Sequence, residues 1–304
     1  SYSETEGYKT YVWNEVAAVG KPKLPIALTE YNIFAIGSNQ PVSHANGMHA
    51  VLVTGELIRT GYGAANRWDL ANGWDNGNDH GMFSFNEPNI PKFTPHPAFF
   101  HLYYMRRHTG DVLLNSSITG ASGVVITPTA FSSGQIGASL VNTAKVRKVV
   151  RLNLRDYKVG ERYYTYTLTG TEGEDFSRRV FINGTGGSLA AGGPADYESV
   201  KAGGYLIGEE IKIILPPLSA VYVLVEPGNR ELAINNIVTS SGRTNEENDI
   251  AVFPNPSSGS FTVINLPDNY RHIEIADIRG SIVLSKEAER GHRETTLNTG
   301  LPPG

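Results

Sequence analysis

The apolar residues in the first third of the chain repeat with the period of a helix, in three stretches bounded by turn residues. The first stretch ends at Gly20, where a C-cap belongs, and one of its faces comprises Tyr8, Tyr11, Val12, Val16 and Val19. Pro41 opens a second stretch, which includes Met48, and Pro97 opens a third that ends at Gly110. This pattern predicts three helices.

Two short runs between these helices are typical of strands. They are "LPIALTEYNIF" (24–34) and "GAANRWDLANGW" (63–74), the second leading into a long polar loop. Helices that alternate with strands indicate an α/β barrel or a doubly wound sheet. Two parallel strands cannot close a barrel or cover their own edges. We therefore expect residues 1–117 to be the C-terminal part of a (β/α)8 TIM barrel, with the remainder of the barrel preceding Ser1.

From about Gly123 the apolar period changes to two residues, as in half-buried strands. Gly, Pro, Asn and Asp separate the runs "GVVITPTAF", "QIGASLVN", "KVRKVVRLNL", "RYYTYTLTG", "RRVFING", "EIKIIL" and "SAVYVLVEP". This predicts a β-sandwich over residues 118–227. Residues 228–249 are polar and aperiodic, which predicts a linker, and residues 250–304 form a small third all-β unit. The predicted fold class is multidomain, with α/β followed by all-β structure.

Composition and charge exclude several classes of protein. The net charge is −4 without strong segregation, so a nucleic-acid-binding protein is not indicated. The chain has no Cys, which excludes disulfides and thiolate metal sites. No stretch approaches the roughly 20 apolar residues of a membrane span. The 33 Gly, 17 Pro and 15 Tyr favour turn-rich β structure with aromatic surfaces.

One carboxylate interrupts the first predicted strand, since Glu30 follows "LPIALT" and precedes Tyr31 and Asn32. Barrel enzymes place their chemistry at the carboxyl ends of the strands, where side chains converge on one mouth. A structural glutamate paired with an Arg is the alternative interpretation. The position of Glu30 makes it the first candidate for a catalytic residue.

The segment "LPIALTEYN" and the elements after it resemble the last quarter of clan A glycoside hydrolases, nearest to the α-L-arabinofuranosidase and β-xylosidase-like members. The resemblance covers roughly residues 1–226 and includes the strand "LPPLSAVYVLV" (215–225). It implies that Glu30 is the nucleophile of a retaining glycosidase, located after the seventh barrel strand. A second carboxyl about 5–5.5 Å away would protonate the leaving oxygen.

The sequence "NEPN" (86–89) spells the acid/base motif of that clan, but its position is wrong. In the clan the acid/base precedes the nucleophile, whereas Glu87 follows Glu30 and lies after the eighth strand. We therefore expect Glu87 not to be the acid, and the acid/base to precede Ser1.

Several polar and aromatic residues are candidate sugar contacts. Trp68 and Trp74 flank the eighth strand and its loop, and an indole ring stacks well on the apolar face of a sugar. Tyr31 and Asn32 are placed to hydrogen-bond the nucleophile or the sugar. Packing inside the protein is the alternative for each of them, and Arg67 either pairs with a carboxylate or closes a strand.

No cofactor is expected from the sequence. The segment "DNGNDHG" (75–81) concentrates oxygen ligands but lacks the EF-hand spacing, so a solvated turn is the expectation and a structural calcium site the alternative. The histidines of the helical region follow no zinc-protease pattern and are expected to be satisfied polar residues: His44, His49, His96 and His101.

The C-terminal unit carries two turn motifs in register. "VFPNPSSGSFTV" opens at Val252, and Asp277 begins the D-x-x-G turn of "IEIADIRGSIVLS". These motifs resemble the C-terminal sorting domain of type IX secretion in Bacteroidetes. The resemblance implies the type IX secretion machinery as a partner and a secreted or cell-surface location. An accessory glycan-binding β domain is the alternative.

The resulting functional hypothesis is a secreted retaining glycoside hydrolase that acts on a plant or algal polysaccharide, arabinofuranosidase- or xylosidase-like. An endo-acting cellulase, xylanase or agarase of the same clan is the alternative within the enzyme class. A non-catalytic carbohydrate-binding surface protein is the alternative outside it.

Overall fold

The computed structural model describes residues 2–35, 37–74, 80–228, 251–253, 260–264, 266, 272–276, 282–287 and 294–298. Its first region alternates helices and strands: α1 (Tyr2–Ala18), β1 (Ala27–Tyr31), the 3-10 turn η1 (Gln40–Val42), α2 (His44–Thr60), β2 (Ala64–Arg67) and α3 (Pro97–His108). The three predicted helices and two predicted strands are all present. None of the described helices is long and apolar enough to cross a membrane.

The strands β1 and β2 are parallel neighbours, as predicted. Ala27 pairs with Ala64 and Tyr31 with Arg67, and the register shifts between Leu28 and Tyr31 as at a β-bulge. Both strands are shorter than their apolar runs. Helix α2 begins later than predicted, because Pro41 belongs to η1, and it ends at Gly61 in the left-handed conformation (φ 71°).

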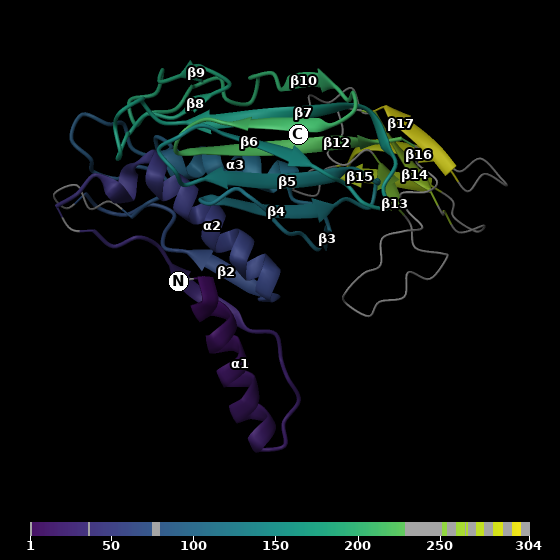
Figure 1. Cartoon of the computed structure of the whole chain (residues 1–304), viewed down its shortest axis with the longest axis horizontal. Helices are drawn as coiled ribbons and strands as arrows, with labels where there is room; N and C mark the ends of the chain where they lie inside the picture. Colours follow the sequence, from purple (N-terminus) through teal and green to yellow (C-terminus); the bar gives the residue numbers. More distant parts are fainter. Residues whose placement is uncertain are drawn as a thin grey trace.

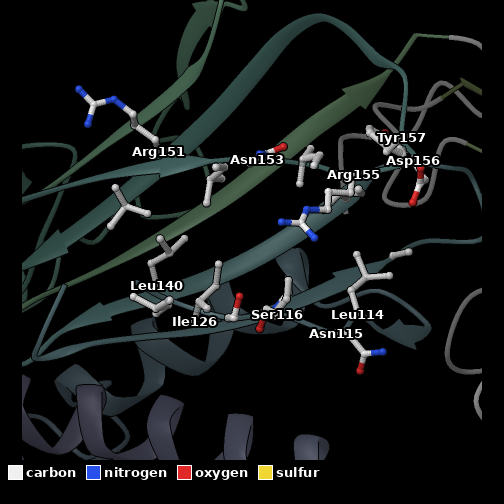
Figure 2. A pocket seen from close by; sticks show the side chains of 18 of the residues that line it. Leu114, Asn115, Ser116, Ile126, Leu140, Arg151, Asn153, Arg155, Asp156 and Tyr157 are labelled. Atoms are coloured by element: carbon white, nitrogen blue, oxygen red, sulfur yellow. The ribbon is translucent and has the colours of Figure 1, made fainter. Parts of the chain in front are cut away.

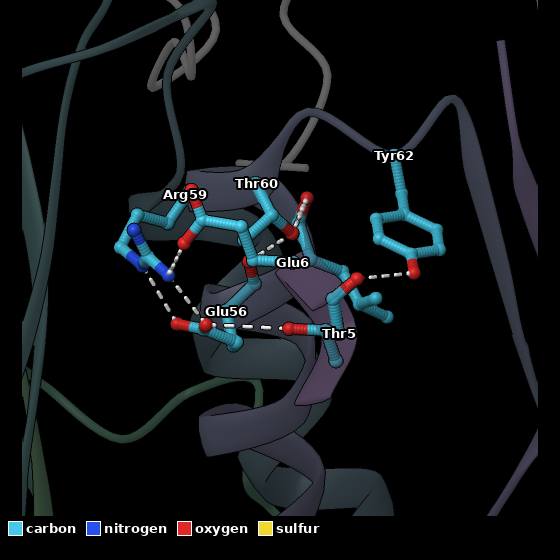
Figure 3. A network of polar contacts seen from close by, with 7 residues as sticks. Thr5, Glu6, Glu56, Arg59, Thr60 and Tyr62 are labelled. Carbon is cyan, nitrogen blue, oxygen red and sulfur yellow. Dashed lines mark hydrogen bonds and ion pairs between the residues drawn. The ribbon is translucent and has the colours of Figure 1, made fainter. Parts of the chain in front are cut away.

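A buried carboxylate joins α1 to α2 (Figure 3). Glu56 on α2 accepts hydrogen bonds of 2.8 and 2.6 Å from Arg59, and the Thr5 hydroxyl on α1 lies 3.3 Å from its Oε1. The Tyr62 hydroxyl donates to the Thr5 carbonyl at 2.7 Å. These contacts hold one end of α1, whereas its apolar face is open, with Tyr8 67% and Tyr11 65% exposed.

The second region is a β domain built on one eight-stranded sheet. The path through the sheet is β3-β4-β5-β12-β7-β8-β9, and β10 pairs with β7. Its strands are β3 (Val112–Leu113), β4 (Val124–Ala130), β5 (Ile136–Asn142), β7 (Val159–Thr169), β8 (Phe181–Ile182), β9 (Thr185–Gly186), β10 (Gly203–Leu206) and β12 (Ser219–Pro227). All the predicted β runs contain strands, and β3 begins the sheet ahead of the predicted boundary at residue 118.

Helices α2 and α3 pack on one face of this sheet (Figure 1). The core between them contains large, fully buried side chains from both layers, including Phe100 and Tyr104 of α3 and Tyr222 of β12. The Tyr104 hydroxyl donates to the Tyr197 carbonyl at 2.7 Å, which satisfies its buried polar group. The β domain is therefore one packed unit with the helical region.

A two-stranded sheet, β6 (Lys148–Leu152) with β11 (Ile211–Leu215), forms a second core with the large sheet. Ile213 and Leu215 are fully buried there, together with Leu140 and Val223 of the large sheet. The layout of a complete β-sandwich stays a prediction.

The C-terminal region contains short antiparallel strands. β13 (Ala251–Phe253), β14 (Ser260–Ile264) and β17 (Glu294–Asn298) form one sheet, and β15 (His272–Ala276) pairs with β16 (Ile282–Glu287). Val263, Leu266 and Leu297 form its core. The predicted linker and both turn motifs, the P-N-P-x-x-G segment and the turn at Asp277, lie outside the described residues apart from Gly228.

Candidate functional site

Glu30 lies near the carboxyl end of β1, beside the matching end of β2. Its side chain is exposed, and the register shift between Leu28 and Tyr31 falls at this point of the strand. Bulges are frequent next to active sites because they re-aim a side chain. Across the described ranges of the chain, the Glu30 carboxylate makes no hydrogen bond or ion pair, so the alternative of a structural salt bridge has no support here.

Tyr31 points toward α2 and is half-buried. The Tyr31 and Thr54 hydroxyls share a hydrogen bond of 2.9 Å. Burial raises the pKa of the Tyr31 phenol, against smaller lowering effects of the Thr54 hydrogen bond and the Arg67 charge. Tyr31 therefore links β1 to α2 by a hydrogen bond, one residue after Glu30.

Asn32 connects the ends of the two strands. Its Nδ2 donates to the Trp68 carbonyl and, at 3.0 Å, to the His80 carbonyl, and its Oδ1 accepts from the Ile33 amide at 2.8 Å. The His80 carbonyl also accepts a hydrogen bond of 3.0 Å from the Arg67 Nη1. The His80 peptide is thus an anchor for both strand ends, a role that the sequence of the 75–81 segment did not indicate.

Trp68 is an exposed aromatic residue at the same end of the two strands as Glu30. It follows β2 directly, its amide donates to the Tyr31 carbonyl at 3.0 Å, and 46% of the residue is exposed. Phe34, 70% exposed, stacks on the His80 ring with the centroids 5.4 Å apart. Apolar ring surface is therefore available at the same end of the strands as the free carboxylate.

Trp74 lies further along the loop after β2 and is half-buried. Its amide donates to the Phe85 carbonyl at 3.1 Å. The guanidinium carbon of Arg178, a residue of the β domain, lies 5.5 Å from the centroid of its ring. The structure thus joins Trp74 to a residue that sequence reasoning did not single out.

Glu87 of the "NEPN" motif is buried in the loop after β2, as the order of elements predicts. Its Oε2 lies 3.1 Å from the His96 Nε2, its Oε1 pairs with the Arg178 guanidinium, and its side chain is 2% exposed. Burial alone would raise the pKa of the Glu87 carboxyl, but hydrogen bonds and positive charge from His96 and Arg178 bring it below its ordinary value. A paired, ionised carboxylate of this kind is unsuited to donate a proton to a leaving group.

Three of the four histidines expected to be satisfied have hydrogen-bond partners. The His44 Nε2 lies 2.8 Å from the Leu218 carbonyl, and the His101 Nε2 lies 3.0 Å from the His44 Nδ1. His96 lies against Glu87 and, at 2.9 Å, the Gly81 carbonyl. His49 differs, because its buried Nδ1 has no partner among the residues that the structure describes.

A large groove lies elsewhere, in the β domain (Figure 2). Its volume is about 1530 Å³, with Ile126 and Leu140 along one wall and Arg151 and Asn153 along the other. It shares no residue with the ends of β1 and β2, and Asp156 is the one carboxylate in its lining. A lone carboxylate does not provide the pair that glycoside hydrolysis requires.

The segment considered for calcium falls mostly on residues 75–79, outside the described residues. Among all the residues that the structure describes, no three His, Asp or Glu side chains come together as a metal site would require.

Comparison with known proteins supports export and a glycosidase-like fold. Residues 251–303 match the secretion system C-terminal sorting domain. This type IX secretion domain indicates export to the cell surface or the extracellular space and confirms the predicted resemblance of the tail. No curated protein sequence matches the chain.

Among solved structures, the chain is similar to CelM2, a bifunctional glucanase-xylanase from a metagenome library, with a TM-score of 0.50 and 15% identity over 73% of this chain and 34% of that chain. It is also similar to the GH51 alpha-L-arabinofuranosidase of Thermotoga petrophila (TM-score 0.49, 16% identity, 74% of this chain and 50% of that chain). A GH30 endoxylanase of Clostridium papyrosolvens matches with a TM-score of 0.42 and 13% identity over 71% of this chain and 44% of that chain. The chain spans about a third to a half of the length of these structures, and its likeness to CelM2 is one of fold.

Proposed function

We propose that this chain is part of a secreted retaining glycoside hydrolase in which Glu30 is the nucleophile. The observation that carries the proposal is the exposed, unpaired Glu30 carboxylate at a bulge near the carboxyl end of a parallel strand. The glycosidase-like fold and the sorting domain at residues 251–303 support it. A secreted protein with this fold meets polysaccharide outside the cell.

In the proposed reaction, a carboxylate oxygen of Glu30 attacks the anomeric carbon of the sugar. The bond from that carbon to the leaving oxygen breaks, the leaving oxygen takes a proton from a second carboxyl group, and a glycosyl ester forms on Glu30. The second group then removes a proton from water, which attacks the same carbon and releases Glu30. Two inversions give net retention of configuration.

The second carboxyl group is proposed to precede Ser1 in the full-length protein. Glu87 does not fit that role, because its carboxylate is buried and ion-paired with His96 and Arg178. The open edges of β1 and β2 and the exposed apolar face of α1 are surfaces against which further elements of a barrel would pack.

The proposed substrate is a plant or algal polysaccharide with arabinofuranosyl or xylosyl units. The motif resemblance around Glu30 supports this class, and the exposed Trp68 ring offers a stacking surface for a sugar beside the nucleophile. Tyr31 and Asn32, which were predicted sugar contacts, are proposed to position Glu30 and Trp68 through their bonds to Thr54, Trp68 and His80.

The test is a Glu30→Gln substitution in the full-length protein. We expect turnover of 4-nitrophenyl α-L-arabinofuranoside or β-D-xyloside to fall by about 10³-fold or more, because the amide is a poor nucleophile. Glu15→Gln is the matched control, since Glu15 is an exposed carboxylate on α1. A fluorinated substrate analogue that leaves a stable ester should label the peptide containing Glu30, as read by mass spectrometry.

A loss of only a few-fold in the Glu30→Gln variant would reject Glu30 as nucleophile. The non-catalytic alternative has a different signature. In that case the unmodified full-length protein would bind oligosaccharides but turn over neither glycoside.

A further inference from the structure

The buried cluster around Glu87 lies outside the reaction just described, yet it connects the β domain to the loop after β2. Glu87 belongs to that loop and Arg178 to the segment between β7 and β8, 91 residues later. The Glu87 side chain is 2% exposed and the Arg178 side chain 27%. A charge pair with a nearly fully buried carboxylate costs desolvation and forms only where its geometry is well satisfied.

Each oxygen of Glu87 has a separate partner. Arg178 occupies Oε1, and the His96 Nε2 lies 3.1 Å from Oε2. The other ring nitrogen of His96 lies 2.9 Å from the Gly81 carbonyl. Glu87 and His96 therefore connect Arg178 to the backbone carbonyl of Gly81.

The preceding peptide of the same loop contacts the ends of β1 and β2, where the proposed active site lies. The His80 carbonyl, adjacent to Gly81, accepts hydrogen bonds from Asn32 and Arg67, each 3.0 Å long. Asn32 in turn binds the carbonyl of Trp68 and lies two residues after Glu30. A continuous series of short polar contacts thus runs from the β domain to the ends of β1 and β2.

The same guanidinium also contacts Trp74. Its central carbon lies 5.5 Å from the centroid of the indole ring, within the range of a cation–π contact. Since Arg178 holds Glu87 and Trp74 together, it fixes two points of one loop. The loop carries the second aromatic residue predicted to bind sugar.

We propose that Arg178 is a positioning residue for oligosaccharide binding, through which the β domain sets the place of Trp74 relative to Glu30. The inference rests on the proposed function and adds to it that the binding of longer substrates depends on Arg178. Sugar units that reach Trp74 depend on Arg178. A single glycosyl unit at Glu30 does not, because the Tyr31–Thr54 and Asn32–Trp68 hydrogen bonds hold that end of the strands without Arg178. A clamp that only stabilises the fold would affect both kinds of substrate alike.

The experiment compares Arg178→Met with Arg179→Met in the full-length protein. Arg179 is the matched control, because it is the next residue in the chain, has the same side chain and is exposed. We expect Arg178→Met to raise the KM for arabinoxylo-oligosaccharides about tenfold, the size of one lost charge-assisted contact. Its kcat/KM for 4-nitrophenyl α-L-arabinofuranoside should change less than about twofold. Arg179→Met should change neither.

Trp74→Ala gives a second test that leaves the Glu87–Arg178 pair in place. We expect it to raise the same KM, and we expect Arg178→Met to add little in the Trp74→Ala background, because contacting residues act non-additively. Equal loss on short and long substrates, additive effects of the two substitutions, or an unchanged KM would each overturn the proposal.

A readout without catalysis separates this inference from the proposed function. Arg178→Met should change the acrylamide quenching of tryptophan fluorescence, and that change should vanish in the Trp74→Ala background. If Glu30→Gln keeps its turnover, the nucleophile assignment fails, while the quenching comparison and the KM comparison for oligosaccharides still decide the role of Arg178. Unchanged quenching would overturn it.

Discussion

At the scale of single residues, close packing decides which side chain fits at a position, as at Gly47. Gly47 lies on α2 where that helix meets α3, and a Cβ built on it would lie 2.1 Å from the His101 Cδ2. The His101 ring cannot move aside easily, because it is held by His44 at 3.0 Å and by the Tyr222 hydroxyl at 3.2 Å. Glycine at this position therefore permits the close approach of two helices.

This predicts that Gly47→Ala destabilises the protein by about 1–3 kcal/mol, because overpacking outweighs the gain in helix propensity. Gly7→Ala on α1 is the matched control, since nothing lies within 4 Å of the added Cβ. Gly7→Ala should be neutral or stabilise by up to about 1 kcal/mol. Urea unfolding of both variants measures the difference. A Gly47→Ala variant as stable as wild type would show that the helices can separate at little cost.

At the scale of elements, buried histidines form hydrogen bonds within and between the packed elements. The His44 Nε2–H donates to the Leu218 carbonyl, which leaves its Nδ1 to accept from the His101 Nε2–H. The His108 Nδ1–H donates to the Tyr104 carbonyl at 2.7 Å. Burial lowers the pKa of His44 and of His108 to about 4, against the opposing effect of these backbone hydrogen bonds. Burial and the nearby His44 also hold the pKa of His101 well below its ordinary value.

The lowered pKa values of these histidines predict that the protein loses stability in acid. Between about pH 6.5 and pH 4 the unfolded chain binds protons at His44 and His108 that the folded chain does not, so the free energy of unfolding falls as the pH falls. Each histidine contributes up to about 3 kcal/mol over that interval. Urea midpoints measured from pH 7.5 to 4.5 should show this slope.

His108→Gln should reduce the slope, because it removes one of the groups whose pKa burial lowers in the folded chain. An equal slope in the His108→Gln variant and in wild type would contradict the assignment.

At the scale of the whole molecule, the sorting domain has a core of its own. Its core of Val263, Leu266 and Leu297 is distinct from the two cores of the preceding regions. The domain match at residues 251–303 indicates export. Export and folding should therefore depend on different parts of the chain.

Deleting residues 251–304 from the full-length protein in its native host should abolish release to the surface or medium. The truncated protein should stay in the periplasm with an unchanged melting temperature for the remaining chain. Immunoblots of cell fractions measure the location, and the Glu30→Gln variant with an intact tail is the control that should be exported normally. Equal extracellular amounts with and without the tail would contradict a sorting role.

The local pattern of the sequence determined the order of the elements. The helical period up to Gly110 and the two-residue period after Gly123 depend on backbone geometry within a few residues, and the structure confirms the elements they predicted. The turn motifs of the tail were equally readable, because they are local sequence features with a fixed spacing.

Only the tertiary structure decided which side chains meet. The sequence did not indicate that Tyr31 turns toward Thr54, that the His80 carbonyl anchors Asn32, or that Glu87 pairs with Arg178. These contacts join residues between 23 and 91 positions apart, so they depend on how α2, α3 and the sheet pack. Local periodicity carries no information about such distances, because it reports which face of an element is apolar but not which element lies against it.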